Sequence, residues 1–175
     1  MTATAPVPLI GRVTAAALLA VTATALSACG ADTLQERAQP TITLDQAKTQ
    51  IDGYLAAVQA RLPVQPVSSP PAFSDLECDA NDIGPHGRKQ TSRVRDLGDV
   101  PSDAKARTVT AFRDYLTGQG FQAVPEPTGS HIDRIRLRNP QNQFLAILNG
   151  TSDSGHDLTL QVGSPCVWPD GTPAK

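Results

Sequence analysis

The sequence has 175 residues, of which 39% are hydrophobic and 18% charged, and its 15 basic and 17 acidic residues give a net charge of −2. This length is enough for one globular domain and too short for two of ordinary size. Nucleic-acid-binding proteins usually carry a strong basic excess and stack bases on aromatic side chains. Because only 4% of the residues here are aromatic and the charge is near neutral, we expect no nucleic-acid partner.

An uncharged run of apolar and small residues begins just after Arg12 and extends from residue 13 to residue 26. A transmembrane helix needs roughly 20 such residues, and this run is shorter. The run is therefore typical of the hydrophobic region of a signal peptide. We predict that residues 1–28 form this signal and are removed.

The run ends in Leu26-Ser27-Ala28-Cys29, which is similar to the lipobox of bacterial lipoproteins. In those proteins the cysteine thiol receives a diacylglyceryl group, and the signal is cut just before the cysteine. The resemblance implies that Cys29 is the lipid-attachment residue, with acyl chains such as palmitate holding the protein to the outer face of the cell membrane. Several acyl chains on one cysteine bind a bilayer far better than one does. The alternative is an ordinary secretory signal in which Cys29 is incidental.

Cys78 and Cys166 are the two remaining cysteines. An even pair in a chain exported to an oxidising compartment predicts a disulfide, which would close a long loop worth about 4 to 5 kcal/mol in the chain-entropy model. Two free buried thiols are the alternative. We expect no zinc site, because neither cysteine has a second ligand at the spacing that such sites use.

The first half of the mature chain predicts a tether, a helix and two strands. Residues 29–40 combine the lipid-bearing cysteine with a polar segment typical of a flexible tether. Thr43 and Gln46 have the spacing of a capping box, and an apolar stripe then predicts an amphipathic helix up to Leu62. The strands are expected at 73–78 and 89–97, after a proline-rich connector over 64–72 and on either side of a loop over 79–87.

The second half predicts another helix and four short strands. Ser102 is expected to be the N-cap of the helix, whose buried stripe would be Ala106, Val109, Phe112 and Leu116. Turn residues separate the expected strands 121–124, 131–138, 143–149 and 157–163. The segment 144–148 is apolar on both faces, so we place it in the middle of the sheet.

This order of elements predicts a single α+β domain over residues 41–169, followed by a C-terminal tail over 170–175. Two helices would pack on one face of a mostly antiparallel sheet. Cys166, just after the last strand, would then be bonded to the first strand at Cys78, so that one disulfide staples the domain.

A resemblance to a known group rests on the lipobox, the Ala- and Thr-rich signal, the two domain cysteines, and Cys78-Asp79 followed by Gly84-Pro85-His86-Gly87-Arg88. With these features, most of residues 43–169 resembles the small lipoproteins of actinobacteria, in particular the mycobacterial LppA-like group. The resemblance implies a location and a general build. It implies no catalytic residue, because none belongs to the pattern of the group.

No segment of the sequence fully matches a motif for enzymatic or metal chemistry. The segment 79–84 looks like the start of a calcium loop, but Ile83 and Gln90 stand where such a loop needs an oxygen ligand and a glutamate. A weaker calcium or anion site in this loop stays open. The segment 150–155 misplaces the second glycine of a nucleophile elbow. The histidines, His86, His131 and His156, lack metal-ligand spacing. We therefore predict no enzyme, no cofactor and no metal site.

Arginines form the most suggestive pattern. Arg134, Arg136 and Arg138 recur every second residue, so in a strand they lie on one face. The guanidinium group suits phosphate and carboxylate, which makes these residues a possible anion-binding site. If the two polar strands are neighbours, the patch would also include Arg88, Lys89, Arg93 and Arg95. The alternative is a solvated face whose arginines pair with Asp96, Asp133 or Glu126.

These patterns together predict a membrane-anchored, non-enzymatic envelope lipoprotein. Its partner would be an envelope protein or an anionic lipid or polymer. A carrier that holds a lipidic ligand between helices and sheet is the second hypothesis, and an accessory enzyme with an unrecognised site is the third.

Overall fold

A computed structural model describes residues 34–67, 72–79, 85–125, 134–150 and 157–173. The predicted signal and lipobox, including Cys29, lie outside these residues, as do Glu126, His131, Asp133 and His156. Over the described part of the chain, no helix is both long enough and apolar enough to cross a membrane.

The described elements follow one another in the order α1 (Leu34–Arg37), α2 (Leu44–Gln59), β1 (Ser74–Glu77), β2 (Lys89–Asp99), α3 (Ser102–Gly118), β3 (Gln122–Ala123), β4 (Arg134–Arg138), β5 (Leu145–Gly150) and β6 (Asp157–Gly163). The six strands form one sheet in the order β1-β2-β6-β5-β4-β3, and all neighbours are antiparallel. The predicted α+β fold is confirmed, and so is the interior position of β5.

Helix α2 begins where the capping box predicts. The Thr43 hydroxyl accepts a hydrogen bond of 3.1 Å from the Gln46 backbone N–H, and the Gln46 side chain accepts one of 2.9 Å from the Thr43 N–H. The helix ends at Gln59, before the predicted end at Leu62. The chain leaves the helix early because Pro63 disfavours helical backbone in the residue before it. Leu62 is buried all the same.

Helix α3 begins at Ser102, so Pro101 is its N-cap and the prediction of Ser102 as N-cap is wrong by one residue. Pro101 has an extended ψ of 144°, and its carbonyl accepts the N–H groups of Ala104 and Lys105. The buried stripe is shifted with respect to the prediction. It consists of Ala104, Thr108, Phe112 and Leu116, while Ala106 is exposed.

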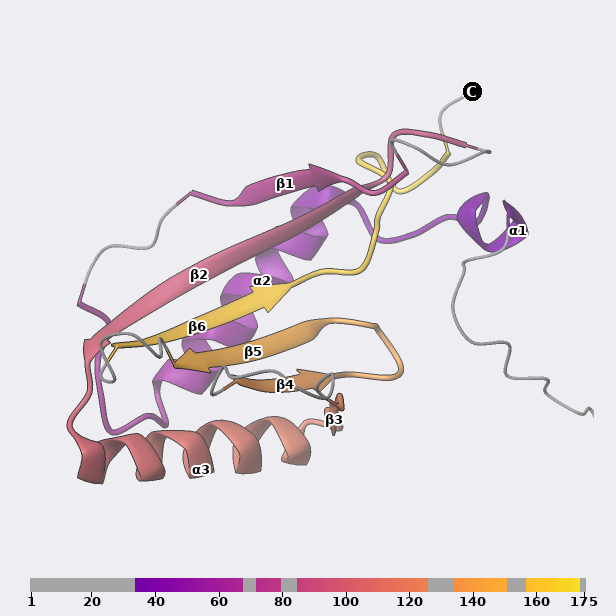
Figure 1. Ribbon diagram of the computed structural model, residues 1–175. Coiled ribbons are helices and arrows are strands. Elements are labelled where there is room, and N and C mark those ends of the chain that lie inside the picture. The colour runs from indigo at the N-terminus through magenta and orange to yellow at the C-terminus, as the bar shows by residue number, and fades with distance from the viewer. Residues whose placement is uncertain (1–33, 68–71, 80–84, 126–133, 151–156, 174–175) are drawn as a thin grey trace, which may run out of the picture. The chain divides into compact units, whose positions relative to one another are not determined.

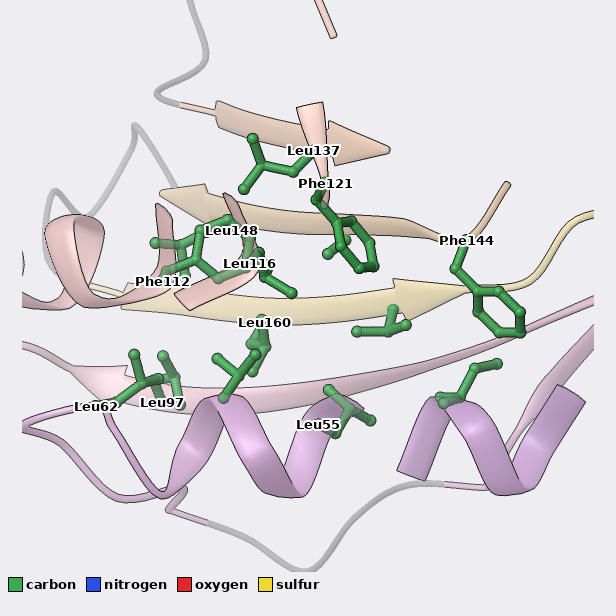
Figure 2. Packing of buried hydrophobic residues seen from close by; sticks show 14 of the residues in the cluster. Leu55, Leu62, Leu97, Phe112, Leu116, Phe121, Leu137, Phe144, Leu148 and Leu160 are labelled. Carbon is green, nitrogen blue, oxygen red and sulfur yellow. The ribbon is translucent and has the colours of Figure 1, made fainter. Parts of the chain in front are cut away.

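Both long helices pack on the same face of the sheet. Helix α2 contacts β2 and β6, and α3 contacts β4 (Figure 1). Side chains from three elements meet in one cluster, which includes Leu55 of α2, Leu160 of β6 and Phe112 of α3 (Figure 2). The side chains on the opposite face of the sheet are therefore directed away from both helices.

The predicted disulfide is confirmed, and it joins Cys78, the residue after β1, to Cys166 after β6. Close to it, the C-terminal segment holds residues that precede α2. The Trp168 backbone N–H donates to the Thr41 hydroxyl over 2.8 Å, and its indole N–H donates to the Gln39 carbonyl over 3.1 Å. The end of the segment predicted as a tether is thus attached to the domain.

Strand β1 is one outer strand of the sheet. Its four residues are exposed, and Leu76 keeps 60% of its surface accessible. Asp75 pairs with Lys48 of α2 over 2.8 Å, and Glu77 pairs with Lys89 of β2 over 3.4 Å. Strand β3, the other outer strand, has only two residues and pairs with the end of β4 alone.

Candidate anion-binding site

The three arginines of β4 lie on one face of the sheet, as predicted. Their register partners on β5 are Asn149, Ile147 and Leu145. Ile135 and Leu137, which alternate with the arginines, pack against the core that the helices cover. Because successive side chains of a strand point to opposite faces, Arg134, Arg136 and Arg138 belong to the face opposite the helices, which we call the arginine face.

Arg134 has a neutral partner. Its Nε donates a hydrogen bond of 2.7 Å to the Asn149 side-chain oxygen, so the contact orients the guanidinium group without cancelling its charge. No carboxylate of the described residues forms an ion pair with Arg134 or Arg138.

Asp96 is the one predicted carboxylate partner inside the described ranges, and it lies too far away. It occupies the same row of the sheet as Arg134, but β6 and β5 stand between them. Three strand spacings amount to about 14 Å. The Asp96 side chain instead accepts a hydrogen bond of 2.8 Å from the Gly98 backbone.

The arginines of β2 do not extend the patch, and this part of the prediction is wrong. Strand β2 is separated from β4 by two strands, and the register places Arg93 and Arg95 in rows with Val162 and Leu160, on the helix face. Arg93 donates to Asp52 of α2 over 2.6 Å and lies 3.7 Å from the centre of the Phe73 ring. These charges therefore stabilise the contact between α2 and β2.

The placement of Arg95 on the helix face disfavours its charged form. Burial lowers the pKa of its guanidinium group, the neighbouring charge of Arg93 lowers it further, and Asp52 acts in the opposite direction. The Nε atom of Arg95 is buried and has no hydrogen-bond partner in the part of the chain described here. Its charge lies beside the core and not on the arginine face.

Two hollows adjoin β4, and neither was predicted from the sequence. The first, of about 230 Å³, lies between α3 and the helix face of the sheet and is lined by Lys105, Val109, Arg134, Ile135, Leu148, Gly150 and Leu158. The second, of about 590 Å³, lies along β4, β3 and the outer side of α3 and also includes Arg134 and Ile135, together with Arg113 and Arg136. None of the described lining residues is acidic.

The residues behind the LppA-like resemblance form a different kind of cluster. Arg88 binds both carboxylate oxygens of Asp79 over 2.8 Å, and the His86 ring contacts the Asp79 carbonyl over 2.7 Å. The hydrogen bonds from Arg88 lower the pKa of Asp79 despite its burial, and the charges of Arg88 and Arg37 add to this effect. Asp79 is therefore occupied by arginine and unsuited to binding calcium. Among all described residues, no group of three His, Cys, Asp or Glu side chains is placed to hold a metal.

No protein-family model matches the chain, and no curated protein or solved structure matches it either. The resemblance to LppA-like lipoproteins stays a prediction. What the chain binds must be inferred from its own residues.

Proposed function

We propose that the protein is a non-enzymatic envelope lipoprotein, attached to the outer face of the cell membrane through an acylated Cys29, whose arginine face binds an anionic component of the envelope. The sequence around Cys29 supports the anchor. The placement of Arg134, Arg136 and Arg138 supports the binding site.

The observation that carries the binding proposal is the row of guanidinium groups on the face directed away from the helices. Alternate residues of an antiparallel strand lie about 6.8 Å apart, so the row presents positive charge at regular steps. Arg134 and Arg138 lack carboxylate partners among the described residues, in a protein whose net charge is −2. A linear polymer with repeating phosphate or carboxylate groups fits this pattern, because several arginines can bind it at once.

The anchor is tested by fractionation. Cys29→Ser should release the protein from sedimented membranes, whereas Ala31→Ser, which introduces the same side chain two residues later, should leave it in the membrane fraction. A Cys29→Ser protein that still sediments with membranes would overturn the anchor.

The binding site is tested with the full chain in detergent and fluorescently labelled polyphosphate. Arg138→Gln should weaken binding several-fold and reduce the slope of log Kd against log salt concentration by about one. The control is Arg107→Gln, since Arg107 is an exposed arginine of α3 that pairs with Asp103. Equal affinity of Arg138→Gln and the unmodified chain would refute this site. Binding to phosphatidylglycerol vesicles but not to polyphosphate would show that the ligand is a lipid head group and not a polymer.

A further inference from the structure

The segment that leads into α2 is fastened to the domain by residues near the C-terminus. Thr41 donates its backbone N–H to the Gly171 carbonyl over 2.9 Å, and its hydroxyl accepts the Trp168 backbone N–H over 2.8 Å. The Trp168 indole N–H donates to the Gln39 carbonyl over 3.1 Å. Residues 166–171 therefore hold this segment in place, and we call them the C-terminal clamp.

The C-terminal clamp is joined to the sheet by a covalent bond, because Cys166 forms the disulfide with Cys78. Trp168 is buried, with 1% of its surface exposed. Next to the disulfide, Arg37 at the end of α1 lies 3.8 Å from the Asp79 carboxylate. Contacts with the domain thus extend back along the chain as far as Arg37.

The chain between these contacts and the predicted lipid-attachment residue has a short reach. Cys29 is five residues before Leu34, where α1 begins, and five residues span at most about 18 Å in any conformation. The rise of α1 adds about 5 Å. If the chain were free up to Thr43, its reach would be about 50 Å. The contacts at Arg37, Gln39 and Thr41 therefore reduce the reach to about half of that value.

We infer that the C-terminal clamp keeps the disulfide-bonded end of the domain at the membrane, so that this end is the surface that faces the lipid head groups. The inference rests on the proposed acylation of Cys29. A reach of about 23 Å is shorter than β2, whose 11 residues extend over about 37 Å. Arg138 shares a row of the sheet with Gly163, close to Cys166. The arginine face therefore has its Arg138 end nearest the membrane.

Energy transfer from Trp168, the single tryptophan, tests the position of this end. The full acylated protein is reconstituted in phosphatidylcholine vesicles that contain a lipid with a dansyl-labelled head group. These vesicles carry no net charge apart from the label, so the arginine face is not attracted to them. Inserting about 12 glycine and serine residues between Ala31 and Asp32 lengthens the tether by roughly 19 Å and should lower the transfer efficiency about two-fold or more. The same insertion after Pro173 is the control and should leave the transfer unchanged.

Two glycine substitutions test the clamp without altering the tether. Gly171 and Gly120 have φ angles of +81° and +83°, so alanine strains the backbone to a similar extent at both. Only at Gly171 would the added Cβ lie 3.2 Å from the Thr41 carbonyl oxygen. In Gly171→Ala, trypsin should cleave the Arg37–Ala38 bond about five-fold faster, because the clamp opens more often. Gly120→Ala should be cleaved there as slowly as the unmodified protein, and mass spectrometry identifies the new N-terminus.

Equal transfer in the unmodified protein and in the Ala31–Asp32 insertion would overturn the position at the membrane. Equal cleavage after Arg37 in the two glycine variants would overturn the clamp. If Gly171→Ala does not fold, Thr41→Val takes its place, since it removes only the hydroxyl that accepts the Trp168 N–H. Protein that does not bind the vesicles at all would overturn the acylated anchor and this inference with it. Bound protein with equal transfer would overturn this inference alone.

Discussion

Arg88 donates two hydrogen bonds of 2.8 Å to Asp79, one from Nε to Oδ2 and one from Nη2 to Oδ1. Both side chains are buried. Asp79 directly follows the disulfide-bonded Cys78, and Arg88 directly precedes β2. The ion pair therefore closes the connection between β1 and β2 at its base, beside the covalent bridge.

Removing one partner of this pair should be costly. Arg88→Met leaves the Asp79 carboxylate buried, with Arg37 at 3.8 Å, and should destabilise the fold by about 3 to 5 kcal/mol. Urea unfolding followed through the fluorescence of Trp168, the single tryptophan, measures this loss. The double variant Asp79→Leu with Arg88→Met should lose less than the two single variants together. Additive losses would show that the two residues are not coupled.

Stability should fall at acid pH in a way that depends on Asp79. Because its pKa is lowered in the folded state, the unfolded chain binds the proton more readily, and the stabilisation is present above the unfolded value near 3.8. It is lost as the pH falls through the lower folded pKa. The difference in unfolding free energy between the unmodified chain and Asp79→Asn should thus shrink from about pH 5 downward.

Asp75 also contributes to the loss of stability at acid pH, but its contribution cancels in the difference between the unmodified chain and Asp79→Asn. Burial raises its pKa, and hydrogen bonds from Lys48 and Thr91 lower it by more, so it also titrates below its ordinary value. It is present in both proteins. A gap between the unmodified chain and Asp79→Asn that stays constant down to pH 2 would contradict the role given to Asp79.

The disulfide should stabilise the fold through the length of the loop that it closes, which spans a sequence separation of 88. Cys78→Ala with Cys166→Ala should lower the free energy of unfolding by about 2 to 5 kcal/mol. A reductant should lower the urea midpoint of the unmodified chain and leave that of the double variant unchanged. Equal midpoints of reduced and oxidised protein would argue against a stabilising bridge.

Two glycine-to-alanine substitutions should change stability in opposite directions. Gly98 has a φ of +67°, and an added Cβ would lie 2.5 Å from a methyl group of Val67, so Gly98→Ala should destabilise by about 1 to 2 kcal/mol. Gly53 lies inside α2 with no neighbour within 4 Å of an added Cβ. Gly53→Ala should stabilise by about 0.5 to 1 kcal/mol, because alanine loses less backbone freedom. Thermal unfolding of the two variants decides both signs.

Much of the fold follows from local patterns. The capping box of Thr43 and Gln46 sets the start of α2, and the pairing of Cys78 with Cys166 follows from there being two cysteines left after the lipobox. Alternation places Arg134, Arg136 and Arg138 on one face regardless of what lies beside β4. Such features depend on residues close together in the chain or on the number of cysteines, and both can be read from the sequence.

Strand order depends on contacts between distant residues, and here prediction failed. Arg93 and Arg95 alternate just as the arginines of β4 do, yet β2 pairs with β6 in a register that places both on the helix face of the sheet. Asp52, which binds Arg93, is 41 positions earlier in the chain. The hollow at Val109 was missed for the same reason, since it depends on how far α3 stands from β5 and β6.

The exposed outer strand β1 has a consequence for the association of copies of this chain. Within the described residues, β1 pairs on one side only, and such an edge is a template for the strand of another molecule. Antiparallel pairing of two β1 strands would bring Asp75 and Glu77 close to the same carboxylates of the second copy, and like charges across strands repel. Asp75 and Glu77, which pair with Lys48 and Lys89 of their own chain, therefore disfavour edge-to-edge pairing of β1 where many copies are crowded together.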